Sequence, residues 1–402
     1  MTQTVPDLVV EGASALAEEL VAFRRDLHAH PETGRNEVRT TERVAQRLKD
    51  AGLEPHFLPG TGLVCDIGDP LAPAVVLRAD LDALPLNDLS GLPYASTVPG
   101  VAHACGHDVH TTVVLGAGLV LAERFERSLP HRVRLLFQAA EELIPGGALD
   151  AMAAGALEDA RMIYSVHCDP RLDVGCIGSR IGPITSAFDQ VLVRLRGPGG
   201  HTSRPHLTAD LIYALGQVIT QVPAALTRRI DLRAVVNLTW GRVHAGHAIN
   251  VIPSEGTIEG TLRCLDTRAW EAAGEFVRTL VAEIAAPYGV ETDVTIRRGL
   301  PPVDNAATAV NVLERAARQV LGEKSVHLTE QSMGGEDFAW YLRDVPGAMV
   351  RLGTRTPGGR TYDLHQGDLA VDEGAIGVGV RLLAAAALIE IPEDDEADSV
   401  RR

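Results

Sequence analysis

Short apolar runs alternate with stretches of helical periodicity in the first part of the chain and again near its C-terminus. The runs are continuous, which is typical of strands buried on both faces of a sheet. We expect such strands at residues 74–77, 134–137, 162–166 and 348–352. The periodicity predicts helices at about residues 10–29, 37–51, 111–127 and 307–321. Strands that alternate with helices predict an α/β fold with a mainly parallel sheet.

The middle of the chain differs, because apolar and polar residues alternate there as in half-exposed strands. We expect strands at residues 188–195, 235–240, 256–265 and 290–296, and helices at 207–222 and 267–288. The order β-α-β-β-α-β is that of a ferredoxin-like unit. We therefore predict an inserted domain at residues 181–296, which divides the α/β domain into residues 1–180 and 297–390. Its unpaired outer strand edges favour a homodimer through this domain.

The stretch from His103 to His110 combines imidazoles, a thiol and a carboxylate. Thiolate and imidazole are the ligands that hold zinc and neighbouring transition metals. We therefore interpret Cys105 and His107 as metal ligands. A polar surface loop with incidental histidines is the alternative interpretation.

Charged and polar side chains also follow directly after the predicted parallel strands. Ligands of α/β sheets bind beyond the carboxyl ends of the strands, so we expect these side chains to meet at one edge. They are Asp80, Asp82, Glu141, Glu142 and His167. The 103–110 stretch, which precedes a predicted helix, can join them there.

The candidate metal ligands are too many for one tetrahedral catalytic zinc, which takes three protein ligands and a water. They are Cys105, His107, Glu142, His167 and His365. Two metals that share a bridging group and a water would use them all. Zinc, manganese, cobalt or nickel suits this mixed set, whereas magnesium and calcium prefer oxygen ligands. His167 and His365 are the weaker members, because a lone histidine is more often a core or surface residue.

Further candidates come from the adjacent glutamates and from the inserted domain. Of Glu141 and Glu142, one can bind metal while the other handles a proton; a solvated loop pair is the ordinary alternative. His201 lies in a glycine-rich loop and could face a substrate, or it could be an incidental turn histidine. Asn250 is a polar residue between apolar pairs. Arg263 could bind a carboxylate, although an edge-strand arginine is usually solvated.

Composition restricts the function further. The 402 residues are enough for two domains, and the formal net charge of -16 argues against nucleic acid or an anionic membrane as the main partner. No apolar run is long enough to span a membrane, and we expect no signal peptide. An odd number of cysteines, five, does not form a disulfide framework. A cytoplasmic location fits best. We predict that residues 391–402 form a disordered acidic tail.

Motifs along nearly the whole chain resemble those of metal-dependent amidohydrolases. This group includes hippurate hydrolase, N-acyl-amino-acid deacylases and auxin–amino-acid hydrolases, within the aminoacylase–carboxypeptidase metallopeptidase family. The motifs occur in the family's order: His28-Ala-His30-Pro-Glu32, Arg78-Ala-Asp80-Leu-Asp82-Ala-Leu-Pro85, His103-Ala-Cys-Gly-His-Asp108, Phe137-Gln-Ala-Ala-Glu-Glu142, Gly200-His201, Asn250-Val-Ile-Pro253 and Gly335-Glu-Asp-Phe338.

The resemblance implies hydrolysis of the amide bond of N-acyl amino acids, or of related small amides, by a metal-bound hydroxide. It implies two divalent metal ions on the five ligands named above, with Cys105 as the bridge. Glu141 matches the general base and Asp82 the carboxylate that orients the site. His201 matches a residue that reaches the scissile carbonyl in the partner subunit's site. Asn250 and Arg263 match the residues that hold the substrate's carboxylate or carbonyl, and the inserted domain matches a lid or dimerisation domain.

Alternative functions make different demands on the sequence. A dipeptidase or aminopeptidase of the same superfamily would need a site for a free α-amine, and no dedicated acidic residue is evident. A catalytically silent metal-dependent binding protein would be favoured by loss of Glu141 or of a ligand, and these residues are all present. A serine hydrolase would need a Gly-x-Ser-x-Gly motif, which the sequence lacks.

Overall fold

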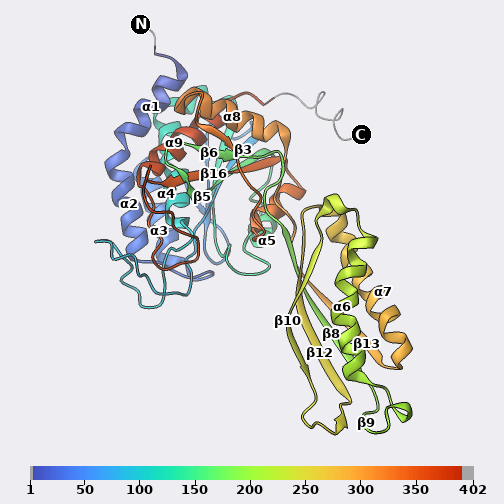
Figure 1. The fold of residues 1–402 in the computed structure, drawn as a ribbon. Helices are drawn as coiled ribbons and strands as arrows, with labels where there is room; N and C mark the ends of the chain where they lie inside the picture. Colours follow the sequence, from blue (N-terminus) through green and yellow to red (C-terminus); the bar gives the residue numbers. More distant parts are fainter. Residues whose placement is uncertain (1–2, 392–402) are drawn as a thin grey trace. The chain divides into compact units, whose positions relative to one another are not determined.

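The computed structural model describes residues 3–391 and divides into two compact units (Figure 1). The first, which we call the α/β unit, comprises residues 3–184, 304–330 and 337–391. The second, the inserted unit, comprises residues 185–303 and 331–336. That residues 181–296 act as a lid or dimerisation domain stays a prediction. The predicted acidic tail lies outside the described residues, apart from its first residue.

An eight-stranded sheet forms the centre of the α/β unit. Its strands are β1 (His56–Phe57), β2 (Leu63–Ile67), β3 (Ala74–Asp80), β4 (Arg132–Gln138), β5 (Ala160–Asp173), β6 (Ile177–Ser179), β15 (Val326–Leu328) and β16 (Gly347–Arg355). Their order is β1-β2-β4-β3-β5-β16-β6-β15. The four central strands β4, β3, β5 and β16 run parallel to one another. Antiparallel pairs add β2 and β1 on one side and β6 on the other.

The central strands are buried over the continuous apolar runs, as those runs predict, although both ends of β5 are partly exposed. Every residue of β3 and of β4 is buried. The helices of this unit are α1 (Val5–Ala15), α2 (Ala17–Ala29), α3 (Val38–Asp50), α4 (His107–Phe125), α5 (Ala148–Ala153), α8 (Ala307–Leu321) and α9 (Gly374–Ala387). Helix α4 packs on β3, β4 and β5, and α8 and α9 pack on β16. A small antiparallel pair, β7 (Gly182–Pro183) and β14 (Asp304–Asn305), lies at the chain's crossings into and out of the inserted unit.

The inserted unit is an antiparallel sheet covered by two helices. Its strands are β8 (Ala187–Arg196), β10 (Asn237–Ala245), β12 (Glu255–Cys264) and β13 (Glu291–Leu300), in the order β10-β12-β8-β13. Its helices are α6 (Leu211–Arg229) and α7 (Thr267–Ala285), which lie side by side on the sheet (Figure 1). Two short strands, β9 (Gly200–His201) and β11 (Val251–Ile252), pair with each other. The chain order β8-α6-β10-β12-α7-β13 is the predicted β-α-β-β-α-β order, so the fold class is confirmed.

Several element boundaries differ from the sequence expectation. The expected helix at 10–29 is two helices that meet at Leu16. The helix expected from residue 111 begins at His107, because Gly106 takes a left-handed conformation and caps it. The helix expected from residue 207 begins at Leu211, where the Asp210 side chain accepts the N–H of Tyr213 at 3.2 Å. The sequence expectation misplaced the first residues of α4 and α6, because apolar periodicity does not mark the residues that cap a helix.

Among residues 3–391, no helix is both long and apolar enough to cross a membrane.

Candidate metal centre and active site

The predicted ligands of the α/β unit come together near the carboxyl ends of β3 and β4 and beside the middle of β5. Cys105 and His107 flank the start of α4, and Glu142 follows β4 by a few residues. His167 lies within β5, and His365 lies in the loop between β16 and α9. The Cys105 sulfur lies 3.6 Å from Nε2 of His167, and Oε1 of Glu142 lies 3.1 Å from Nε2 of His365. Five residues far apart in the sequence therefore share one site.

Gly106 allows the thiol and the first imidazole to occupy the same site. Its φ is 90°, in the left-handed region that glycine tolerates. A Cβ at this position would lie 2.7 Å from the sulfur of Cys168. Glycine is therefore required both for the turn and for the close approach of β5. The turn places Cys105 just before the helix and His107 in its first turn.

The donor atoms form overlapping groups that could each hold a metal ion. The candidate ligand atoms within each group lie within 4.8 Å of one another. Four of these groups contain sequence-predicted ligands: Cys105–His107–His167, Cys105–Glu142–His365, His107–Glu141–Glu142 and Asp80–His107–His110. Cys105 is common to the first two. A shared donor between two groups is the arrangement that a pair of bridged metals needs.

Hydrogen bonds fix how the imidazoles face this site. Nδ1 of His167 lies 2.9 Å from the carbonyl oxygen of Cys168, so it donates there and leaves the Nε2 lone pair toward Cys105. Nδ1 of His107 lies 3.3 Å from Oδ1 of Asp82. Its Nε2 is buried and has no hydrogen-bond partner in the described part of the chain. A buried polar atom without a partner is costly, and a metal ion would satisfy it.

The protonation tendencies also favour a bound cation. Burial alone would lower the pKa of His107, yet Asp80 and Cys105 raise it well above the ordinary value. Hydrogen bonds to Cys105 and Glu142 raise the pKa of His365 to about 10. Burial, with Arg351 nearby, lowers the pKa of His167 well below its ordinary value and keeps that ring neutral, as a ligand must be. The donors around Cys105 therefore attract positive charge, which a divalent metal supplies.

Asp82 holds the backbone that carries the two glutamates. Its Oδ1 accepts the N–H of Glu141 and its Oδ2 accepts the N–H of Glu142, both at 3.0 Å. Oε2 of Glu141 and Oε1 of Glu142 each lie 3.9 Å from Nε2 of His107. Oε1 of Glu141 also accepts the N–H of Asp337 at 3.4 Å. The loop thus presents both neighbouring carboxylates to one site, although neighbours on a strand would point apart.

A buried ionic network adjoins the site; the sequence predicted Asp80 at this edge but none of its partners. Arg78 donates to Oδ2 of Asp80 and to Oδ1 of Asp337, both at 2.8 Å, and to Oε1 of Gln138 at 2.9 Å. Oδ1 of Asp80 lies 2.7 Å from Nδ1 of His110, whose Nε2 accepts the N–H of Cys168 at 2.8 Å. The motifs quoted in the sequence analysis include all three charged residues, Arg78, Asp80 and Asp337. A buried arginine next to two carboxylates cannot be recognised from one sequence.

A second buried network supports the first turn of α4. Nε of Arg24 lies 2.6 Å from Oδ2 of Asp108, and Nδ1 of His28 lies 2.8 Å from the same oxygen. Burial would raise the pKa of Asp108, but Arg24 and His28 hold it well below the usual range. Asp108 therefore supports the helix that carries His107.

The remaining predicted site residues lie in the inserted unit. His201 is exposed on β9, and its Nδ1 accepts the N–H of Ser203 at 3.1 Å. Asn250 is exposed just before β11, and its carbonyl accepts the N–H of Thr202 at 3.2 Å. Arg263 on β12 donates to the carbonyl of Met333 and lies over the Phe188 ring at 5.1 Å. The five predicted metal ligands therefore belong to the α/β unit, and the predicted substrate contacts belong to the inserted unit.

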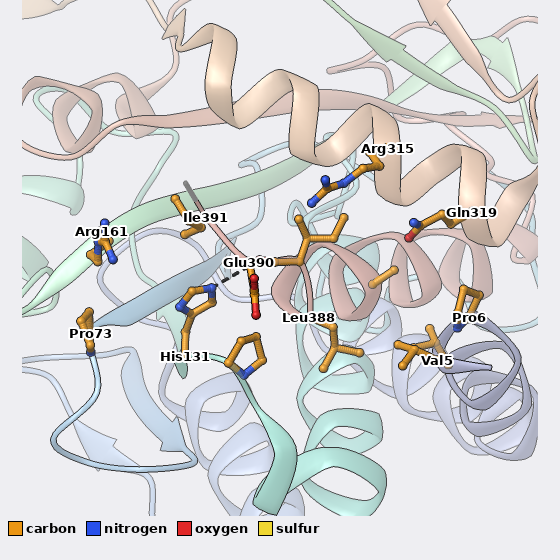
Figure 2. Close-up of a pocket in the computed structure, with 14 residues that line it drawn as sticks. Val5, Pro6, Pro73, His131, Arg161, Arg315, Gln319, Leu388, Glu390 and Ile391 are labelled. Carbon is orange, nitrogen blue, oxygen red and sulfur yellow. Dashed lines mark hydrogen bonds between the residues drawn. The ribbon is translucent and has the colours of Figure 1, made fainter. Parts of the chain in front are cut away.

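A hollow of about 900 Å³ lies elsewhere in the α/β unit (Figure 2). Pro73, His131 and Arg161, which line it, lie at the amino ends of β3, β4 and β5. The hollow is therefore on the edge of the sheet where ligands of α/β folds do not usually bind. The candidate metal ligands do not line it.

A parallel α/β sheet with thiolate, imidazole and carboxylate donors at its carboxyl edge defines a metal-binding hydrolase. The chain belongs to peptidase family M20/M25/M40, whose sequence model matches residues 76–389. The amidohydrolase family that the motifs predicted is thereby confirmed, and the chain is an enzyme of this family.

Individual relatives extend this result. The chain is 38% identical over 380 residues to a Bacillus subtilis protein named N-acetylcysteine deacetylase, covering 93% of this chain and 97% of that protein. It is 48% identical over 374 residues to a Rhodococcus jostii protein named putative glutamate–cysteine ligase 2-3. That match covers 93% of this chain and 47% of the relative, so the chain spans about half of that protein's length.

A solved structure agrees in fold. The YXEP protein of Bacillus subtilis, described as a dinuclear metal binding peptidase from the M20 family, is similar with a TM-score of 0.82 and 35% sequence identity. The similarity covers 93% of this chain and 98% of that one.

Proposed function

We propose that this protein hydrolyses the amide bond of N-acyl amino acids, or of closely related small amides, with two divalent metal ions. The observation that carries the proposal is the pair of donor groups that share Cys105, with Glu141 beside them. The buried Nε2 of His107, which lacks a hydrogen-bond partner within residues 3–391, supports metal occupancy. The dinuclear centre named for the YXEP protein supports the count of two.

In this proposal the five predicted ligands hold the metals: Cys105, His107, Glu142, His167 and His365. The bound metals would activate a water molecule and polarise the acyl oxygen. Zinc, manganese, cobalt or nickel suits the mixed donor set. Magnesium and calcium suit it poorly, because they prefer all-oxygen sites.

Glu141 is the proposed general base. Its carboxylate removes a proton from the attacking water and delivers it to the leaving amine. Asp82 fixes the position of this carboxylate through the N–H of Glu141 and orients His107 through Nδ1. The burial of Glu141 and Asp82 restricts bulk water, which strengthens their electrostatic action on the substrate.

The inserted unit is proposed to supply the remaining contacts. His201 would stabilise the negative charge on the acyl oxygen, in the site of the partner subunit of a homodimer. Asn250 and Arg263 would bind the carboxylate or carbonyl of the substrate. A dimer through this unit is supported by the exposed apolar side chains of Val243 on the edge strand β10 and of Ile249 and Val251 nearby.

The relatives' names narrow the substrates to be tested first. The Bacillus subtilis relative is named for deacetylation of N-acetylcysteine, and the partly matching Rhodococcus jostii protein has glutamate and cysteine in its name. Short acyl groups on cysteine and other small amino acids are therefore the leading candidates within the proposed class.

The proposal is tested with metal-free protein reconstituted separately with zinc, manganese, cobalt or nickel. Release of free amine is measured on N-acetyl, N-benzoyl and N-indoleacetyl amino acids, and on unblocked dipeptides. Hydrolysis of the N-acyl amino acids that requires added metal supports the proposal. Hydrolysis of dipeptides alone would establish a peptidase instead. Metal binding without hydrolysis of any substrate would establish a binding protein.

A further inference from the structure

Two buried carboxylates accept three successive backbone N–H groups, those of Ala140, Glu141 and Glu142. Asp82 accepts the N–H groups of Glu141 and Glu142, each at 3.0 Å. Oε1 of Glu37 accepts the N–H of the preceding residue, Ala140, at 2.7 Å. Glu37 and Asp82 thus act on the same short segment from two positions.

Ala140 has a backbone conformation that requires support. Its φ is 56°, in the left-handed region that costs an alanine free energy. The N–H of Gly147 donates to the carbonyl of Ala140 at 3.0 Å, which closes the loop beyond the glutamates. The left-handed residue turns the chain at the end of β4, so Glu141 and Glu142 can both face His107. The hydrogen bond from Ala140 to Glu37 stabilises this turn.

Glu37 itself is fully buried. Its Oε2 accepts the hydroxyl of Thr61 at 2.7 Å, and its Oε1 accepts the Ala140 amide. These partners are neutral, and burial raises the pKa of the Glu37 carboxyl. A buried carboxyl group reduces stability unless its hydrogen bonds compensate, so its location is better explained by the turn that it holds than by a gain in stability.

We infer that Glu37 is a positioning residue for the active site, which holds Ala140 in its left-handed conformation and thereby sets the placement of Glu141 and Glu142. This inference deepens the proposed function and rests on it. Glu37 contacts neither substrate nor metal in this account. It acts through the backbone, alongside Asp82.

The chain offers a matched control in Glu32. Oε1 of Glu32 accepts the N–H of Arg39 at 3.0 Å, and its Oε2 accepts the N–H of Thr40 at 2.8 Å and the Thr40 hydroxyl at 2.9 Å. Glu32 therefore also joins backbone amides and a threonine hydroxyl. Its partners lie in the first turn of α3, whereas those of Glu37 include Ala140 in the loop that carries Glu141 and Glu142.

The test compares Glu37→Ala, Glu37→Gln and Glu32→Ala in the full-length, metal-loaded protein. We measure kcat, KM, metal affinity and Tm for each. Glu37→Ala should lower kcat by about 10- to 100-fold, the usual effect of losing an outer-shell partner, and should also weaken metal binding through Glu142. Glu37→Gln should stay within a few-fold of the original protein, because its amide oxygen can still accept the Ala140 N–H. Glu32→Ala should lower Tm with kcat unchanged.

A second-site variant separates positioning from general stability. Ala140→Gly in the Glu37→Ala background should recover kcat several-fold, because glycine adopts positive φ without steric cost. The same change in the Glu32→Ala background should not raise kcat. If Glu37→Ala does not fold, Glu37→Leu replaces it, since leucine fills the buried space without an acceptor.

Three results would overturn the inference. They are an unchanged kcat in Glu37→Ala, equal losses of kcat in the Glu37→Ala and Glu32→Ala proteins, or no recovery with Ala140→Gly. Failure of the proposed function would look different, because the original protein would then hydrolyse none of the amides. Metal affinity is then the deciding measurement. If Glu37→Ala binds metal more weakly than the original protein and Glu32→Ala does not, the positioning role of Glu37 is kept. If Glu37→Ala binds metal as tightly as the original protein, the positioning role is removed.

Discussion

The metal-donor edge of the α/β unit and the substrate-contact residues of the inserted unit differ in how firmly their side chains are held. At the donor edge, Cys105, His107 and Glu141 are buried. Asp82 accepts the backbone N–H of Glu141 and so holds the loop that carries it. In the inserted unit, His201 and Asn250 are exposed, and the hydrogen bonds described above join only the two short segments that carry them. The first region is preorganised within one unit.

The difference indicates a division of labour. A catalytic metal site needs fixed donors, because small displacements of ligands weaken binding and orientation. Residues that bind a substrate and then release it can be carried on a separate unit that moves as a whole. Variants at the donor edge should therefore change metal binding or chemistry, whereas variants of the inserted unit should change turnover or substrate binding with metal content unaltered.

The largest effect is expected for Glu141→Gln. The amide cannot accept a proton from water, so kcat should fall by about 10²- to 10⁴-fold, the usual contribution of a general base. Metal content should stay at the level of the original protein, because the five proposed ligands remain. The measurement is steady-state amine release together with elemental analysis. Retained activity would remove Glu141 from its proposed role.

His201→Ala should come next in size. Loss of a donor to the acyl oxygen typically lowers kcat by about 10²- to 10³-fold. Metal content and Tm should be unchanged, since His201 is exposed and remote in sequence from every donor group. The matched control is His206→Ala, a second exposed histidine nearby on the chain. Equal activity of the two variants would show that His201 does not contribute to catalysis. It would also contradict the proposed roles of the two units.

Asp82→Ala should have a smaller effect, and mainly on metal. Removing the carboxylate frees the N–H groups of Glu141 and Glu142 and leaves Nδ1 of His107 without its acidic neighbour. Metal affinity should fall by about 10- to 100-fold, as measured by competition with a chelating dye. An unchanged affinity would mean that the loop holds its shape without Asp82.

The smallest effect concerns the turn at Gly106. Gly106→Ala should lower the free energy of unfolding by about 1–3 kcal/mol from its left-handed backbone alone, with a further loss from the contact with Cys168. Gly175→Ala is the control, because Gly175 has a similar φ of 94° but nothing within 4 Å of an added Cβ. Urea titration of both proteins measures the difference. Equal losses would show that β5 yields to the new methyl group.

The sequence predicted the donor edge well because parallel strands deliver the residues that follow them to one edge. Glu141 and Glu142 could be placed by that rule, and Cys105 and His107 by their ligand chemistry. His167 does not follow the rule, because β5 continues past it to Asp173. The rule did not reveal Arg78 or Glu37, since a buried charged residue looks like a surface residue in the sequence. It did not locate the start of α4 at His107 either, because Gly106 acts as a cap only through its backbone conformation. The substrate contacts of His201, Asn250 and Arg263 stay a prediction, because no local sequence pattern encodes a contact with a substrate or with a partner subunit.

The number of metal ions bound per chain decides whether Cys105 joins two metal sites. Metal-free protein and its Cys105→Ser variant are titrated with zinc by isothermal calorimetry, and the bound metal is then counted by elemental analysis. We expect two zinc ions per chain in the original protein, and weaker binding with loss of at least one ion in the variant, because Cys105 is a donor in two groups. A single ion in the original protein, or two equally tight ions in both proteins, would contradict it.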